Sequence, residues 1–202
     1  TWSAAYALVA LATLTKGPQA PVYFGGAIVA FLAFSRDWRY LFTRQHLAGF
    51  CVFLAVWGAW HVPYQMAVGW EGAVKIYTTN AEQRFENPIG IGTVVSHLLT
   101  YPAETLACLL PWSVLLLAYL RRGFRAAIGP ARSHVLFLAC CLAVAFPTCW
   151  FVPTGRTRYF MPLYPCIACL AGLAADRCWQ AGADARWRSL WSRFLGAVAI
   201  AA

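Results

Sequence analysis

Charged side chains are scarce in this chain. They make up 11% of its 202 residues, whereas about 25% is usual for a soluble domain. Hydrophobic residues reach 61% and the mean hydropathy is +0.58, and a soluble core of this size could not bury so much apolar surface. The composition therefore excludes an ordinary soluble domain and predicts an all-α, polytopic membrane protein, since helices satisfy their own backbone groups in lipid.

Acidic residues are particularly few. The chain has seven Asp and Glu residues against sixteen Lys and Arg, which gives a net charge of +9. Such an excess could indicate nucleic-acid binding, but the basic residues do not form one patch. They fall in short clusters between apolar runs, a pattern typical of membrane topology. We therefore expect membrane lipids and no nucleic acid among the partners.

Catalytic and metal-binding motifs are also lacking. Lys16-Gly17 is not part of a P-loop, and neither G-x-S-x-G nor H-E-x-x-H occurs. His61 and His97 lack metal-ligand spacing, and the Cys166–Cys169 pair has no second pair or histidine at zinc spacing. We interpret the eight cysteines as packing residues between helices. The sequence thus indicates no cofactor and no metal site, and leaves metal dependence open.

Apolar runs divide the chain into membrane helices, each needing about 20 residues to cross the hydrocarbon core. Thr15 to Gln19 interrupt the first run, which predicts a helical hairpin with Lys16 at its tip. Polar residues 65–97 predict a long loop, and 176–193 an amphipathic interfacial helix. We expect one integral membrane domain over 1–202, a fragment whose N-terminal catalytic loop and C-terminal part are missing. Six to seven spans are predicted, over 2–14, 20–34, 46–64, 98–120, 135–152, 159–175 and from 194 onward.

The basic residues predict which side each loop faces. Eleven of the sixteen Lys and Arg residues fall in 35–45, 121–134 and 176–193, segments that must share one side because two spans separate each from the next. This excess marks the cytoplasmic side. The hairpin tip, the 65–97 loop and the turn near Arg156 then form the outward-facing region. That region keeps five basic residues: Lys16, Lys75, Arg84, Arg156 and Arg158.

Arg156 and Arg158 are the most unusual of these basic residues. They lie between two apolar runs, and Pro153, Gly155 and Pro162 interrupt the backbone around them. Charge near hydrocarbon is costly and usually has a function, and the arginine fork suits phosphate. We predict that Arg156, Arg158 and Tyr159 hold an anionic lipid phosphate. The alternative is that these side chains extend to lipid headgroups.

Two outward carboxylates, Glu82 and Glu104, are candidates for acid/base chemistry or for acceptor binding. Glu104 lies either inside the fourth span or in the first turn of a helix that starts at Pro102, where the helix dipole favours an acid; we favour the second interpretation. Glu82 either serves the site or pairs with Arg84. These alternatives remain open from sequence alone.

Three short motifs carry a resemblance to a known family. Residues 14–18 read Leu-Thr-Lys-Gly-Pro, residues 83–85 read Gln-Arg-Phe with Pro111-Trp112 further on, and residues 158–165 read Arg-Tyr-Phe-Met-Pro-Leu-Tyr-Pro. In order and spacing they resemble the membrane glycosyltransferases of GT-C type that use polyprenyl-phosphate sugar donors. That family includes protein O-mannosyltransferases and the aminoarabinose transferases of lipid A. The likeness covers most of residues 10–175.

The resemblance implies an inverting transfer from an undecaprenyl- or dolichyl-phosphate sugar to a lipid, glycan or protein acceptor. It places the active site at the outer face of a membrane, which we expect to be a bacterial inner membrane. It also implies that the catalytic acidic residue lies upstream of this chain, and that Lys16, Arg84, Arg158 and Tyr159 belong to the donor site. One departure concerns the acceptor side: the family has an acid and a His before Q-R-F, whereas residues 79–82 read Thr-Asn-Ala-Glu.

Two other functions fit the same features. A transporter or flippase for an anionic lipid or solute would use a similar basic cleft, although the sequence shows no convincing internal repeat. A non-enzymatic helical scaffold would leave the outward basic residues free to vary.

Overall fold

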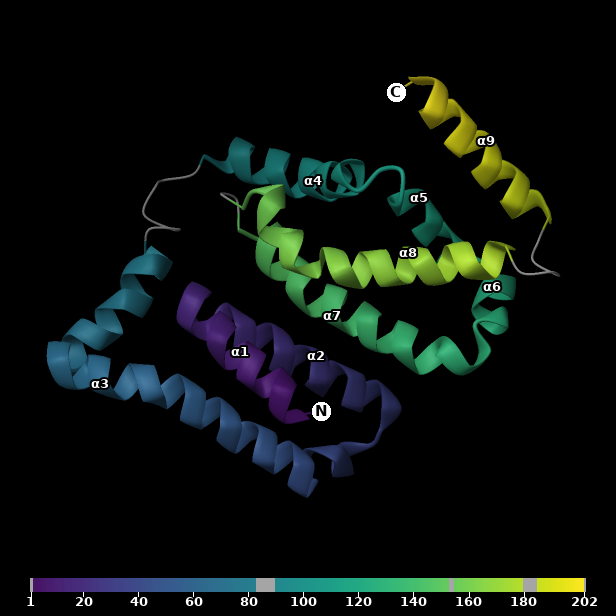
Figure 1. The fold of residues 1–202 in the computed structure, drawn as a ribbon. Coiled ribbons are helices and arrows are strands. Elements are labelled where there is room, and N and C mark those ends of the chain that lie inside the picture. The colour runs from purple at the N-terminus through teal and green to yellow at the C-terminus, as the bar shows by residue number, and fades with distance from the viewer. Residues whose placement is uncertain (1, 83–89, 153–154, 180–184, 202) are drawn as a thin grey trace. The chain divides into compact units, whose positions relative to one another are not determined.

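The structure, a computed structural model, describes residues 2–82, 90–152, 155–179 and 185–201. All regular elements in these ranges are helices (Figure 1), so the predicted all-α class is confirmed. The chain divides into two compact units, Thr1–Gly90 and Ile91–Ala202. Each unit has its own internal packing.

A helical hairpin begins the first unit. Helix α1 (Trp2–Lys16) and helix α2 (Gln19–Ser35) lie side by side (Figure 1). Gly17 has a φ of +79°, and its N–H donates to the Thr13 carbonyl at 2.8 Å, which closes the end of α1. Pro18 then leads into α2 with a φ of −71°. The predicted hairpin with Lys16 at its tip is therefore confirmed.

Helix α3 (Arg44–Glu82) follows the short helix η1 (Trp38–Phe42) and packs along α1. Thr43 caps it, because the Thr43 hydroxyl accepts the His46 N–H at 3.3 Å. The Tyr6 hydroxyl is 2.7 Å from His46 Nε2. A Cβ added to Gly49 would lie 2.5 Å from Tyr6 Cδ2, so the close approach of the two helices depends on this glycine.

The predicted polar loop 65–97 is wrong in extent. Helix α3 continues to Glu82, interrupted only where Gly69 takes a φ of 77° and a ψ of 170°, and α4 already begins at Ile91. Loss of apolar character predicts where a chain leaves hydrocarbon, but polar residues such as Glu, Lys and Gln form helices readily. Helix α3 therefore extends beyond the end of the apolar run.

The predicted fourth span, 98–120, is a broken helix. Helix α4 (Ile91–Cys108) is followed by α5 (Ser113–Leu116) and η2 (Leu117–Leu120), bent by 109° from α4. Pro102 lies inside α4 and lacks an N–H, which frees the Leu98 carbonyl. The Trp150 indole N–H donates to that carbonyl at 2.8 Å, so a distant residue completes the helix there.

Further helices complete the second unit. They are α6 (Arg122–Ala127), η3 (Gly129–Ala131), α7 (Arg132–Trp150), η4 (Thr157–Leu163), α8 (Tyr164–Trp179) and α9 (Ala185–Ala201). Helix α7 packs against α8, and α5 packs on α8 as well (Figure 1). The predicted interfacial helix 176–193 is wrong in its bounds, because residues 176–179 continue α8 and α9 joins residues 185–193 to the start of the predicted seventh span. The buried core contains Leu115, Ala118, Ala171, Ala174 and Trp191.

Three helical segments of the described chain are long and apolar enough to cross a membrane: Arg44–Lys75, Arg132–Trp150 and Thr157–Arg177. The bent pair of Ile91–Cys108 and Ser113–Leu120 makes four if it counts as one span. Helices α1 and α2, with 15 and 17 residues, are shorter. Apolar helices compatible with a polytopic membrane protein are therefore present, and the larger number of six to seven spans stays a prediction.

Candidate anion site at the α7–η4 turn

The turn between α7 and η4 positions Arg156. The Gly155 N–H donates to the Val152 carbonyl at 2.7 Å. A Cβ on Gly155 would lie 2.5 Å from the Cys149 carbonyl oxygen and 2.8 Å from that of Val152. Because only glycine lacks a Cβ, the chain can fold back on the end of α7 here and bring the next residues to the surface.

Phe160 anchors η4 to the rest of the unit. Its ring is 3% exposed and makes an edge contact with Phe146 of α7 at 5.5 Å between centroids. Phe146 also contacts Tyr101 of α4 at 5.8 Å. With Phe160 turned inward, Arg156, Arg158 and Tyr159 are exposed on the same short helix and its approach. The structure thus brings these three predicted site residues together.

Arg158 and Tyr159 form a cation–π pair. The guanidinium carbon of Arg158 lies 5.7 Å from the Tyr159 ring centroid, a contact worth about 0.5–1 kcal/mol at an exposed position. Among the residues that the structure describes, no carboxylate forms an ion pair with Arg156 or Arg158. Both guanidiniums are therefore available to an anionic group.

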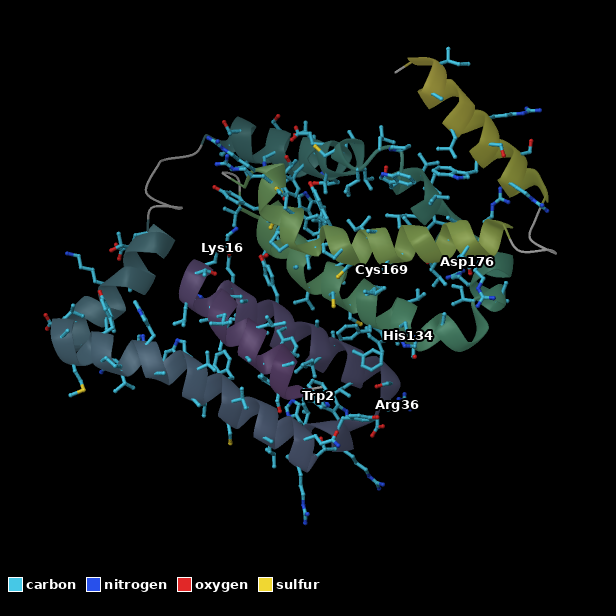
Figure 2. The ribbon with its side chains drawn as sticks, in the orientation of Figure 1. Trp2, Lys16, Arg36, His134, Cys169 and Asp176 are labelled. Atoms are coloured by element: carbon cyan, nitrogen blue, oxygen red, sulfur yellow. The ribbon has the colours of Figure 1, made fainter. Side chains whose placement is uncertain are left out.

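Two further basic residues, Lys16 and Arg84, are predicted for the donor site. Lys16 is exposed at the end of α1, in the first unit (Figure 2). Arg84 lies outside the described residues, as do the rest of its Q-R-F motif and Pro153. The donor-site roles of Lys16 and Arg84 stay predictions from the sequence.

The two carboxylates are both exposed. Glu82 is the last residue of α3, and Glu104 lies well inside α4. The favoured interpretation, in which the helix starts at Pro102 and Glu104 occupies its first turn, is therefore wrong. A proline favours a helix start, but here the indole of Trp150 satisfies the carbonyl that Pro102 leaves free inside the helix. Glu104 is a mid-helix acid.

A polar pair on α4, Tyr101 and His97, is not predicted from the sequence. Tyr101 is 1% exposed, and its side chain interacts with Cys149 of α7. The buried His97 Nε2 has no hydrogen-bond partner in the described part of the chain. The two rings are 4.9 Å apart. The signal in the sequence is the i, i+4 spacing, which places both residues on one helix face.

Thiols and metal ligands form no evident centre. The described residues contain no group of three or more His, Cys, Asp or Glu side chains that could hold a metal ion. Cys141 of α7 and Cys166 of α8 form a thiol hydrogen bond across the helix interface. This contact fits the interpretation of cysteines as packing residues.

Comparison with known proteins found no matching family model, no matching curated protein and no matching solved structure. Inferences about function therefore depend on the exposed arginines of the α7–η4 turn and on the three short motifs described above.

Proposed function

We propose that this chain is part of a membrane glycosyltransferase that moves a sugar from a polyprenyl-phosphate donor to a lipid, glycan or protein acceptor. The observation that carries the proposal is the exposed pair of guanidiniums, Arg156 and Arg158, that no described carboxylate neutralises. The pair adjoins apolar helices, where an uncompensated charge calls for a functional reason. The motif resemblance supplies the reaction class.

Arg158 and Arg156 would bind the donor phosphate in this reaction. When the acceptor attacks the sugar carbon, the lipid phosphate departs and gains charge. Arginines already held in place stabilise that charge without having to reorganise. Tyr159 keeps the Arg158 guanidinium oriented through its ring. These residues bind and orient the donor, and the acid or base for the acceptor hydroxyl is assigned to none of them.

The proposal includes a membrane arrangement. Six to seven spans would cross a bacterial inner membrane, with the α7–η4 turn at its outer face. The positive charge of 35–45, 121–134 and 176–193 supports this orientation. Glu82 and Glu104 remain candidates for the acceptor side.

Substitution of Arg158 tests the donor site. In the full-length protein, Arg158→Ala should lower sugar transfer from a radiolabelled polyprenyl-phosphate sugar by about 10²-fold or more, as for loss of a preorganised charge-stabilising donor. Arg158→Lys should retain part of the activity, because it keeps the charge but not the fork. Arg39→Ala, at an exposed arginine of η1, is the matched control. Unchanged transfer by a normally inserted Arg158→Ala protein would refute the donor site.

A transporter or flippase is the second candidate, and the broken helix favours it. Transporters commonly build their sites from discontinuous helices, and α4 and α5 are bent by 109°. Reconstitution in vesicles separates the two functions. Movement of a lipid phosphate across the bilayer without sugar transfer would favour the transporter.

A further inference from the structure

An apolar groove runs between the broken fourth helix and α8. Its volume is about 360 Å³. Leu109, Trp112 and Leu115 line one side, and Ala168, Gly172 and Ala175 line the side formed by α8. The groove therefore follows α8 over several turns.

Small residues and the helix break create this space. Because alanine and glycine have small side chains or none, they do not fill the space beside α8. The bend after Cys108 turns the facing helix away from α8. A Cβ added to Gly172 would meet no atom within 4 Å. The groove is thus an open space that a larger side chain could fill.

A hydrocarbon chain is the occupant that fits the groove. Water requires two to four polar partners, and apolar cavities stay dry. At about 30 Å³ for each water-sized group, the space holds about a dozen carbon-sized groups. A second helix, about 10–12 Å across, needs more room. In a bilayer, lipid chains supply such an occupant.

Helices α6 and α9 bring basic residues to the neighbourhood of one end of the groove. Leu115, which lines the groove, belongs to the same buried core as Trp191 of α9. Phe124 of α6 and Ala175, another lining residue, pack against that core. Each of these aromatic residues lies between two arginines in the sequence. The four arginines are exposed: Arg122 and Arg125 on α6, and Arg188 and Arg193 on α9. Basic pockets between membrane helices on the cytoplasmic side favour anionic headgroups.

We propose that the groove and these four arginines, the basic rim, bind an anionic membrane phospholipid. One acyl chain lies along α8 beside Gly172, and the phosphate lies at the basic rim. Tyr164, directly after η4, lines the end of the groove nearer Arg158, whereas the basic rim adjoins the Ala175 end. The phosphate site at the rim therefore does not use Arg156 or Arg158 and does not depend on the proposed transferase activity.

Filling the groove tests the proposal. Native mass spectrometry of the full-length protein in detergent should show bound phosphatidylglycerol in the wild type and at least tenfold less in Gly172→Phe. Cys169→Phe is the matched control, because Cys169 is an exposed residue of the same helix that does not line the groove (Figure 2). It should retain the lipid.

A surface variant keeps the proposal testable if Gly172→Phe misfolds. The double variant Arg122→Gln, Arg125→Gln should bind phosphatidylglycerol at least fivefold more weakly while its weak affinity for phosphatidylcholine stays unchanged. Equal binding of the two lipids by the wild type, or full retention by Gly172→Phe, would overturn the proposal. Loss of the lipid only on substitution of Arg156 and Arg158 would do so too, and so would a change of oligomeric state in Gly172→Phe without lipid loss.

Discussion

At the level of single residues, the anion site depends on Gly155, which has no side chain, and on the buried ring of Phe160. Gly155 lets the backbone pass within contact distance of the Cys149 carbonyl, and Phe160 fixes η4 to Phe146. The sequence alone predicts that Gly155 interrupts the backbone. Its close approach to α7, however, involves atoms several residues away, which a motif does not reveal.

Replacing Gly155 by alanine should disturb this turn. The added methyl group would overlap two carbonyl oxygens, and overpacking of this kind typically destabilises by about 1–3 kcal/mol. Thermal unfolding in detergent should therefore show a lower Tm, and donor binding should weaken as Arg156 shifts. Gly123→Ala on α6, where a Cβ meets nothing within 4 Å, should leave the Tm unchanged or raise it slightly. Equal Tm values for both variants would contradict the role of Gly155.

At the level of secondary-structure elements, α7 and α8 show which features sequence patterns predict and which depend on tertiary contacts. Apolar runs predicted both helices, and the structure places α7 at Arg132–Trp150 and α8 at Tyr164–Trp179. Which residues meet across the interface could not be predicted from either run. The Cys141–Cys166 thiol contact marks the register that the structure gives the pair.

This register predicts a specific cross-link. Oxidation of the full-length protein with copper phenanthroline should join Cys141 to Cys166, since disulfides form only between closely placed thiols. Mass spectrometry of proteolytic fragments should detect the linked peptides. Cys166→Ser should abolish the link, and Cys169→Ser, one turn further along α8, should preserve it. A link from Cys141 to Cys169 instead would show that the register is wrong.

At the level of the whole molecule, charge distribution and packing agree within the second unit. Segments predicted to be cytoplasmic supply α6 and α9, which meet at the core around Ala174. Near the end of α7, Trp150 contacts Leu98 of α4, at the boundary of the predicted outward loop and fourth span, and Phe146 contacts Phe160 of η4. His134 marks the other end of α7, and Asp176 lies near the end of α8 (Figure 2). The side of the membrane that each end faces stays a prediction from the sequence.

Single-cysteine labelling tests that sidedness directly. In a protein whose native cysteines are replaced, Arg156→Cys and Lys16→Cys should react with a membrane-impermeant maleimide added to intact cells. Arg39→Cys and Arg122→Cys should react only after permeabilisation, because the excess of basic residues retains their loops inside. Labelling of all four positions from the same side would refute the orientation.

The sequence by itself determined the helical class, the hairpin tip at Lys16 and the clustering of Arg156 with Arg158. These follow from local properties: hydropathy, the positive φ of a glycine, and short chain separation. Only the tertiary structure decided the break in the fourth helix, the mid-helix position of Glu104 and the groove beside Gly172. Each of these depends on partners far along the chain, as when Trp150 satisfies the carbonyl of Leu98 and allows Pro102 to remain inside a helix. Hydrogen bonding and packing join residues that the sequence keeps apart.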